Sequence, residues 1–456
     1  MLEMETYKIA IWGWGVTGRA SFNYFTKSKD YQDLNLEIDI YDGSEINFPR
    51  QENEPRKNLD INFFPNHNYL ENIEKYDILI ISPSIPETHQ SVIEARNLGK
   101  SVFNDASYFV KKWRELGKKS IGVTGSNGKT TVSSLLYEIL QKTGIKTTLV
   151  GNIGKSPLDI LLQIERGEIE VDLPVIELSS YQLETFNETE YVDYAIITNI
   201  SPNHLDHHEN SMEKYVGAKL KIAGEETKII TVLDDPGIQK YVLPKIKNPH
   251  LVSLENLEDQ NQKSDLEYFA DSNHRKLKGE HNLYNIAIVL KMLEILEIKS
   301  EKTKEIIKNY SGLEHRIEFV KEIHGVKYIN DSKSTSPDSV RVALETFGNH
   351  RNIILIAGGN EKNTSFEFLR EHFNQYVKNL IVLKHHIDQK LIKLADKNQI
   401  PHSSFDNLKD CVSEAKSKSL SGDIILFSPG SGSQPKFKNF EERGKIFKEI
   451  VLTIGD

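Results

Sequence analysis

Cysteine is almost absent from this chain of 456 residues, which contains only Cys411, so an intrachain disulfide is excluded. The chain also lacks an apolar run of the roughly 18 residues that a membrane-spanning helix needs. Its first residues, MLEMET, have neither the basic nor the apolar segment of a secretion signal. These absences predict a protein of the reducing cytoplasm with no membrane partner.

An excess of positive charge is lacking as well. The 57 Lys and Arg residues stand against 66 Asp and Glu residues, which gives a net charge of −9. This balance argues against a nucleic-acid partner, although a local basic site can still bind an acidic substrate. We find no short repeat and no low-complexity tract, and we expect a monomer.

Apolar β-rich segments alternate with amphipathic segments of helical length along nearly the whole chain. This pattern is typical of parallel α/β sheets, and the length exceeds what one core supports. We predict a Rossmann-like N-terminal domain (1–107), a central P-loop mononucleotide-binding domain (108–310) and a Rossmann-like C-terminal domain (311–456). Strands are expected at 7–12, 37–41, 78–81, 101–103, 120–124, 174–178, 195–199, 229–233, 327–329, 353–357, 380–383 and 423–427. The polar stretch 253–280 predicts an excursion with a hairpin, and a long helix should follow at 282–296.

A glycine-rich loop, IGVTGSNGKTT at residues 121–131, lies between an expected strand and an expected helix. Such a loop directs backbone N–H groups at phosphate, and the following helix N-terminus adds positive potential. Lys129 would bridge the β- and γ-phosphates, and the Thr130 hydroxyl would bind Mg²⁺. The usual motif has a glycine at the position of Val123, and here Gly125 takes that role. A plain glycine turn with a solvated lysine is the alternative, but the strand–loop–helix context favours nucleotide phosphate.

Glu177 ends the next apolar strand. An acid at the C-terminal tip of a buried strand, beside a phosphate loop, is placed where Mg²⁺ coordination is needed. A helix-capping or salt-bridged glutamate is the alternative.

A second glycine turn, GWGVTG at residues 13–18, follows the first expected strand, and Asp42 ends the next one. This arrangement is typical of dinucleotide-binding folds. Any pyrophosphate can use the same turn, however. With an ATP loop in the next domain, a nucleotide diphosphate on the substrate is favoured over NAD.

Eight motifs carry a resemblance to the Mur ligases, and most closely to those that add D-glutamate; it covers the whole chain. The most discriminating is ELSSYQLE at 177–184, which differs in Mur ligases for other amino acids and in folylpolyglutamate synthetases. The others are TGSNGKTT (124–131), GNIG (151–154), NISPNHLD (199–206), GEHN (279–282), LEHR (313–316), NDSK (330–333) and KNF (438–440).

The resemblance implies a reaction in the cytoplasmic stage of peptidoglycan synthesis. ATP would phosphorylate the terminal carboxylate of UDP-N-acetylmuramoyl-L-alanine, and the amine of D-glutamate would attack the acyl phosphate. Two anions must meet, so Mg²⁺ and lysines are needed to neutralise charge.

The resemblance also implies which residues bind ATP and two Mg²⁺ ions. The ATP site would comprise Gly125, Ser126, Asn127, Gly128, Lys129, Thr130, Thr131, Asn282, Asn285, Arg316, Asp331 and Lys333. Arg316, Asp331 and Lys333 would meet the nucleotide when domains close. The metal ligands would be Thr130, Glu177, His204 and Lys219, the last after carbamylation. Lys129, Glu177, His204 and Lys219 would form the catalytic set.

The two other substrates are assigned to both ends of the chain. The resemblance places UDP-N-acetylmuramoyl-L-alanine in the N-terminal domain and central turns, at Gly15, Val16, Thr17, Ser44, Asn152, Ser179 and Gln182. D-glutamate would be held by Thr335, Lys362, Ser433 and Phe440. The chain departs from the family pattern at Gly43, Ser44, Asn360, Asn363 and residues 434–437, so the contacts there can be built differently.

Several alternatives stay open for the same residues. His204, His207 and His208 with Asp206 could suggest zinc, but no second ligand group with suitable spacing is present. Without the resemblance, His204 would be a hydrogen-bonded loop residue and Lys219 a solvated lysine. Other functions to be weighed are a folylpolyglutamate synthetase, which lacks an N-terminal Gly-x-Gly domain, and a dinucleotide-binding sensor that uses ATP as a ligand.

Overall fold

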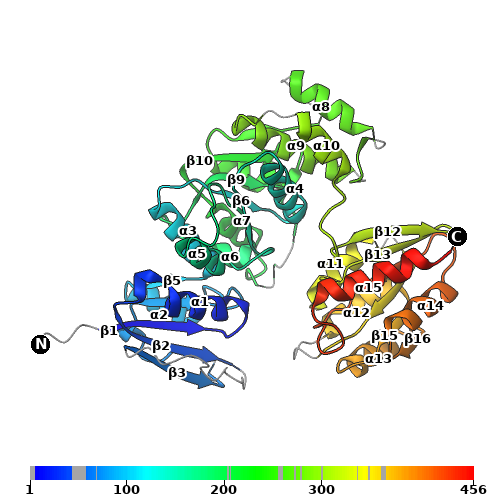
Figure 1. Ribbon diagram of the computed structural model, residues 1–456, viewed down its shortest axis with the longest axis horizontal. Coiled ribbons are helices and arrows are strands. Elements are labelled where there is room, and N and C mark those ends of the chain that lie inside the picture. Colours follow the sequence, from blue (N-terminus) through cyan, green and yellow to red (C-terminus); the bar gives the residue numbers. More distant parts are fainter. Residues whose placement is uncertain are drawn as a thin grey trace, which may run out of the picture. The chain divides into compact units, whose positions relative to one another are not determined.

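The computed structural model describes residues 6–43, 58–67, 69–202, 205, 207–254, 260–271, 274–277, 280–298, 301–335, 337–347, 350–360 and 366–455. The chain divides into two compact units, residues 1–310 and 311–456. Three separate sheets, shown in Figure 1, confirm the α/β fold class. No helix in the described part of the chain is long and apolar enough to cross a membrane.

The first sheet has the strand order β3-β2-β1-β4-β5, and all of its strand pairs are parallel. Its strands are β1 (Thr6–Trp12), β2 (Asn35–Asp42), β3 (Leu59–Pro65), β4 (Ile78–Ile81) and β5 (Ser101–Phe103). The order reverses between β1 and β4, and this is the point at which doubly wound sheets bind ligands. The glycine turn that begins at Gly13 therefore lies at the ligand-binding edge. The half-exposed edge strand β3 was not predicted.

The second sheet is also parallel, with the order β11-β10-β9-β6-β8-β7. Its strands are β6 (Ile121–Thr124), β7 (Leu149–Gly151), β8 (Val175–Glu177), β9 (Val192–Ile197), β10 (Ala223–Val232) and β11 (His250–Val252). Because β6 lies between β8 and β9, the loops that follow these three strands meet at one edge of the sheet.

The helices of residues 1–310 pack around these two sheets. They are α1 (Val16–Lys27), α2 (Gln90–Asn97), α3 (Asp105–Glu115), α4 (Lys129–Lys142), α5 (Pro157–Glu165), α6 (Ser180–Glu184), α7 (Met212–Leu220), α8 (Gln260–Ala270), α9 (Glu280–Ile295) and α10 (Glu301–Asn309). The expected long helix is confirmed by α9. The prediction of a hairpin within 253–280 is wrong for residues 260–270, because these residues form the helix α8. The three-residue spacing of the buried Leu266 and Phe269 places both on one helical face.

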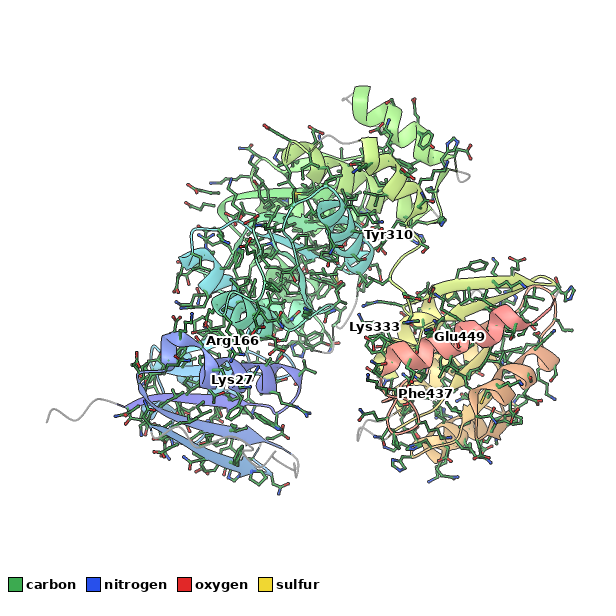
Figure 2. All side chains as sticks on the ribbon, in the orientation of Figure 1. Lys27, Arg166, Tyr310, Lys333, Phe437 and Glu449 are labelled. Atoms are coloured by element: carbon green, nitrogen blue, oxygen red, sulfur yellow. The ribbon has the colours of Figure 1, made fainter. Side chains whose placement is uncertain are left out.

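A continuous hydrophobic core joins the first sheet to the helices of the second. Buried side chains of α1 and α3 belong to the same cluster as those of α5, among them Tyr24 and Leu161. Hydrogen bonds cross the seam from Asn23 to Asp159 (3.2 Å) and from the Tyr24 hydroxyl to Glu165 (2.6 Å). Figure 2 labels Lys27 and Arg166 at this junction. The proposed boundary after residue 107 falls inside α3, so the division of 1–310 into two domains stays a prediction.

The unit 311–456 contains the third sheet, with the order β12-β13-β17-β14-β15-β16. Its strands are β12 (Glu318–Ile323), β13 (Val326–Asn330), β14 (Ile353–Ala357), β15 (Val377–Leu383), β16 (His402–Phe405) and β17 (Ile424–Phe427), and only the pair β12 and β13 is antiparallel. The helices are α11 (Pro337–Phe347), α12 (Arg370–Tyr376), α13 (Asp388–Lys397), α14 (Leu408–Lys418) and α15 (Phe440–Thr453).

Strand β14, whose sequence is IILIA, explains why this third sheet is covered on both faces. Ile353, Leu355 and Ala357 pack into one core with α11, α12 and α13, whereas Ile354 and Ile356 pack into another with α14 and α15. Alternate residues of a strand point to opposite faces, so an uninterrupted apolar strand needs a helical layer on each side. The expected strands at 353–357 and 423–427 are confirmed.

A buried carboxyl group at the start of α3 makes the N-terminal part of the fold sensitive to pH. Asp105 is almost completely buried, and it accepts hydrogen bonds from its neighbour's backbone N–H at Ala106 (3.0 Å) and from the Thr17 hydroxyl. Burial raises the pKa of Asp105 from 3.8 to about 6, against these hydrogen bonds. The folded state therefore binds a proton more tightly than the unfolded chain, and the stability that this provides is lost as pH rises from about 4 through 6.

Replacing Asp105 with Asn should remove this pH dependence, because an amide does not ionise. Between pH 4 and pH 7.5 the native chain should lose about 3 kcal/mol of unfolding free energy that the Asp105→Asn variant keeps. Urea unfolding followed by tryptophan fluorescence is a suitable measurement, because Trp12, Trp14 and Trp113 all lie in this part of the chain. The control Asp172→Asn, which alters an exposed acid of the same unit, should follow the native curve. Parallel curves for native and Asp105→Asn proteins would refute the assignment.

Candidate functional site

The phosphate loop connects β6 to α4, and two glycines shape it. Gly125 has a φ of 142° and Gly128 a φ of 81°, both in the region that favours glycine. A Cβ atom at Gly125 would lie 2.0 Å from the Thr198 hydroxyl oxygen. Val123, which stands where the usual motif has a glycine, is a buried residue of β6 paired with Glu177 of β8. The loop therefore curls after the strand ends, and Gly125 makes the first turn.

Residues that follow β9 hold the loop in its curled form. The Asn199 side chain accepts from the Asn127 backbone N–H and donates to the Asn127 carbonyl, both at 2.9 Å. Thr198 also donates to the Asn127 carbonyl (2.5 Å), and the Ser126 hydroxyl lies 2.9 Å from the Tyr215 hydroxyl. No motif in the sequence marks Thr198 or Tyr215. Thr198 directly follows β9, and Tyr215 lies on α7.

Lys129 begins α4 and turns back over the loop. Its ammonium donates to the carbonyls of Gly125 and Ser126, both at 2.9 Å. Thr130 and Thr131 occupy the same first turn of the helix, where unpaired N–H groups and the helix dipole favour an anion. This geometry suits a polyphosphate with Lys129 at its side.

Glu177 lies at the carboxyl end of β8 and is fully buried. Its carboxylate accepts hydrogen bonds from the Asn152 amide (2.8 Å) and the Ser133 hydroxyl (3.3 Å). The same Ser133 hydroxyl lies 3.3 Å from the Thr130 carbonyl, which links the acid to the first turn of α4. Among the described residues the partners of this carboxylate are neutral, and a buried carboxylate held by neutral donors fits a ligand for a divalent cation. Asn152, expected to contact substrate, is thus brought to Glu177.

Lys219, on α7, is buried and 2% exposed. Its amine donates to the Gly125 carbonyl (2.8 Å) and lies over the ring of Tyr215, 4.6 Å from its centre. Burial, together with the nearby charge of Lys129, lowers the pKa of Lys219 well below 10.5. The simpler view of Lys219 as a solvated lysine is therefore wrong. Burial therefore favours the unprotonated, nucleophilic form of this amine.

The α9 helix supplies two further residues expected at the ATP site. Asn285 is buried, and its amide donates to the Asn282 side chain (3.0 Å). A Cβ atom at Gly128 would lie 2.5 Å from the Asn285 side-chain oxygen. The structure therefore brings Asn285 against the phosphate loop and Asn282 beside it.

His207 and His208, which follow the NISPNHLD motif, are paired with an acid. His204 lies outside the described residues, but His207 and His208 both contact the Glu184 carboxylate. No three His, Cys, Asp or Glu side chains form a metal-binding cluster within the described ranges. The arrangement of His207 and His208 thus gives zinc no support.

Beside the first sheet, the residues predicted to bind substrate include the glycine turn at 13–18, which also makes hydrogen bonds within the fold. Gly15 caps α1, and Val16 is 78% exposed at the start of that helix. Thr17 donates to Asp105, whereas one oxygen of Asp42 accepts from the Trp14 backbone N–H (2.7 Å). Asp42 thus braces the glycine turn. Ser44 lies outside the described residues.

Ser179 and Gln182 form a reciprocal cap at the start of α6. The Ser179 hydroxyl accepts from the Gln182 backbone N–H, and the Gln182 side chain accepts from the Ser179 backbone N–H. The Asn104 amide donates to the Gln182 carbonyl (2.7 Å). Asn104 and Asp105, adjacent at the start of α3, therefore reach two segments that were assigned to the same substrate.

In the unit 311–456, two of the expected nucleotide residues, Asp331 and Lys333, follow β13, and Arg316 precedes β12. Asp331 is buried, and it accepts from the Ser428 hydroxyl (2.7 Å) and the Ile317 backbone N–H (3.2 Å). Burial raises the pKa of Asp331 to about 7, although the Ser428 hydrogen bond and the Arg316 charge oppose this. Lys333 lies over the ring of Phe440, 5.7 Å from its centre. Lys333, a predicted nucleotide ligand, thus contacts Phe440, a predicted D-glutamate ligand.

The expected D-glutamate residues are divided between described and undescribed parts of the chain. Thr335 follows the Lys333 turn, and Ser433 is half-buried beside Gly432, which pairs with Asn360. Lys362 and Asn363 lie outside the described residues.

Arg443 of α15 is a buried residue that the sequence analysis missed. It donates to the Ser332 carbonyl (2.8 Å) and hydroxyl (3.1 Å), and to the carbonyls of Ser431 and Gly432 (both 3.2 Å). One side chain therefore joins the loop that carries Asp331 and Lys333 to the loop that carries Ser433. It lies three residues after Phe440, on the inner face of a helix, and this position gives no motif signal.

Comparison with known proteins gives consistent matches. Residues 123–293 match the Mur ligase middle domain, and residues 315–431 match the Mur ligase glutamate ligase domain. A UDP-N-acetylmuramoylalanine–D-glutamate ligase of Clostridium tetani is 33% identical, covering 89% of this chain and 90% of its own. The same ligase of Clostridium acetobutylicum is 32% identical over 98% and 97% of the two chains. That of Francisella philomiragia is 31% identical over the same shares.

Solved structures share the fold at lower identity. The UDP-N-acetylmuramate–alanine ligase MurC of Thermotoga maritima covers 98% of this chain and 99% of its own, with a TM-score of 0.51 and 18% identity. MurF of the same organism, solved with ADP, covers 83% and 89% of the chains, with a TM-score of 0.50 and 17% identity. At these identities the likeness concerns the fold.

Replacing Gly125 with Ala should abolish nucleotide binding, because the added methyl group collides with Thr198 and the backbone is strained by a positive φ. Gly144→Ala is the matched control, because Gly144 has a φ of 91° but nothing within 4 Å of an added Cβ. Both variants should lose about 1 kcal/mol or more of stability from backbone strain. Only Gly125→Ala should lose ATP binding in calorimetric titration; equal ATP affinities would contradict the role given to the loop.

Proposed function

The chain belongs to the Mur ligase family, and on that premise we propose that it is the ATP-dependent ligase that joins D-glutamate to UDP-N-acetylmuramoyl-L-alanine in peptidoglycan synthesis. The observation that carries the proposal is the match to D-glutamate ligases over 98% of this chain, combined with an assembled phosphate loop. The reaction accounts for the two lysines and the buried acid that converge there.

In the first half of the reaction the phosphate loop holds ATP. Lys129 and the N-terminus of α4 hold the β- and γ-phosphates, and their positive potential lowers the repulsion between ATP and the substrate carboxylate. The γ-phosphoryl group passes to that carboxylate, which gives an acyl phosphate and ADP. Mg²⁺ supplies charge neutralisation when bound, and the Thr130 hydroxyl and the Glu177 carboxylate are the residues that would hold it. Ser133 and Asn152 keep Glu177 in place.

In the second half the amine of D-glutamate attacks the acyl carbon. The tetrahedral intermediate expels phosphate and loses a proton from nitrogen, so that an amide bond remains. Thr335, Lys362, Ser433 and Phe440 would hold D-glutamate, and Arg316, Asp331 and Lys333 would contact the nucleotide. The first sheet, through Gly15, Val16, Thr17 and Ser44, would bind the UDP portion of the other substrate, together with Asn152, Ser179 and Gln182. We place the enzyme in the cytoplasm as a monomer.

The proposal is tested by phosphate release from ATP with UDP-N-acetylmuramoyl-L-alanine and a panel of amino acids. D-Glutamate should support turnover, and L-glutamate should not. Lys129→Ala should lower the rate by about a hundredfold or more, because it removes a preorganised cation. Lys142→Ala, at the exposed end of the same helix, should keep the native rate. Equal turnover with L-glutamate, or none with D-glutamate, would overturn the proposal.

We further propose that Lys219 is carbamylated. Its unprotonated nitrogen would attack the carbon of CO₂ and lose a proton, so that a carbamate with one negative charge forms. The carbamate and His204 would hold the second Mg²⁺ ion, and the new charge would lie beside Lys129, whose positive charge favours it.

Carbamylation predicts a new ¹³C resonance when the protein is equilibrated with ¹³C-bicarbonate near pH 8. The signal should be absent from Lys219→Met, whose turnover should also fall by about a hundredfold. Lys214→Met changes an exposed lysine of the same helix and should keep both the signal and the activity. A spectrum without a carbamate signal in the native protein, or an unchanged signal in Lys219→Met, would remove this assignment.

A further inference from the structure

Glu184, the last residue of α6, is held by two adjacent histidines that no step of the proposed reaction uses. One carboxylate oxygen lies 3.0 Å from Nε2 of His207, and the other lies 3.0 Å from Nδ1 of His208. An ionised carboxylate only accepts hydrogen bonds, so these two ring nitrogens carry the protons. Although burial opposes it, these hydrogen bonds lower the pKa of Glu184 to about 2. The acid is therefore ionised throughout the physiological range.

His208 binds both ends of α6. Its Nε2 atom lies 3.0 Å from the hydroxyl of Ser180, the first residue of the helix, while Nδ1 reaches Glu184, the last. Residues four apart lie on the same face of a helix, so one imidazole ring can span them. The His208 side chain is almost completely buried, and the His207 ring packs against Tyr181 at 4.1 Å. His207 and His208 thus fix the segment to which they belong, residues 207–211, to α6.

The locked segment connects α6 to the phosphate loop. His208 packs against Tyr215 of α7 (5.3 Å between ring centres), and the Tyr215 hydroxyl reaches Ser126. On the other side of residues 202–206, the Ser201 backbone N–H donates to the Ser126 hydroxyl (2.8 Å). The Lys221 ammonium also donates to the Glu184 carbonyl. Ser201 is therefore held by the phosphate loop, and His207 and His208 are held by α6.

We propose that Glu184, His207 and His208 form a clamp of positioning residues that fixes segment 207–211, which follows the expected ligand His204 in the chain, to α6. This inference rests on the proposed function for the role of His204. Groups that orient a ligand in this way commonly change metal affinity or activity by about tenfold to a hundredfold when removed.

The clamp is tested with Glu184→Gln, which keeps the shape but can accept at only one oxygen. Glu190→Gln is the matched control, because Glu190 is a nearby glutamate, even more buried than Glu184, that bonds within its own turn, to Asn187 and Thr189. Hydrogen exchange of residues 207–211, measured in full-length protein without metal or substrate, should be faster in Glu184→Gln than in the control. With substrates, kcat should fall by about tenfold to a hundredfold and the Mg²⁺ concentration for half-maximal rate should rise about tenfold, while the KM for ATP stays near the native value.

The comparison of Glu184→Gln with Glu190→Gln decides whether the clamp fixes segment 207–211. Exchange and kcat that match those of Glu190→Gln would overturn the clamp, as would a loss that appears only in the KM for ATP. If Glu184→Gln does not fold, His207→Gln provides the same comparison, because His207 lies at the outer side of the clamp. If native protein shows no D-glutamate ligase activity, the proposed function fails, whereas the exchange comparison still decides whether the clamp fixes the segment.

Discussion

The Gly125 carbonyl oxygen accepts hydrogen bonds from two lysines, Lys129 at the start of α4 and Lys219 on α7. This contact requires a backbone that curls sharply after β6, and only a glycine packed against Thr198 allows the curl. Two amines on one carbonyl cannot both be charged without cost in a buried site, and burial together with the charge of Lys129 lowers the pKa of Lys219. The loop therefore concentrates positive charge at the nucleotide and keeps a reactive amine within reach of the same site.

Parallel strands explain why the rest of the site gathers around this contact. Strand β6 has β8 and β9 as neighbours, so Glu177 at the end of β8 and Asn199 after β9 reach the same edge of the sheet as the loop. Hydrogen bonds then fix each group, from Asn152 and Ser133 to Glu177 and from Asn199 to Asn127. The chemistry follows from this edge: a phosphate cradle, a buried carboxylate for a cation, and a lysine whose pKa is lowered by burial.

In the unit 311–456, a buried arginine fixes the loops that follow the strands. Arg443 is a buried cation whose hydrogen bonds go to backbone carbonyls and one hydroxyl, and it ties the loop after β13 to the loop after β17. Nearby, burial holds the pKa of Asp331 near 7. A charge taken out of water is costly unless it is hydrogen-bonded, so these groups keep their loops in one arrangement. Loops that carry ligands gain the rigidity of the sheet beneath them.

The sequence by itself determined whatever depends on local pattern. Alternation of apolar strands and amphipathic helices gave the α/β class, and glycine spacing with a following helix located the phosphate loop and the turn at Gly13. The family motifs named most of the candidate ligands, and the structure places Asn152 with Glu177, and Asn285 with Gly128. Helical spacing in α8 was also present in the sequence, but the polar composition of that stretch hid it.

Only the tertiary structure decided which of these groups are buried and what they touch. Lys219 looks like an ordinary surface lysine in sequence, but it is buried against a loop 94 residues away, and this burial, with the charge of Lys129, lowers its pKa. Thr198, Arg443 and the pairing of Glu184 with His207 and His208 have no motif either, because each acts on a segment distant in the chain or behind a helix. Burial and long-range hydrogen bonds are properties of packing, and no local pattern of residues encodes them.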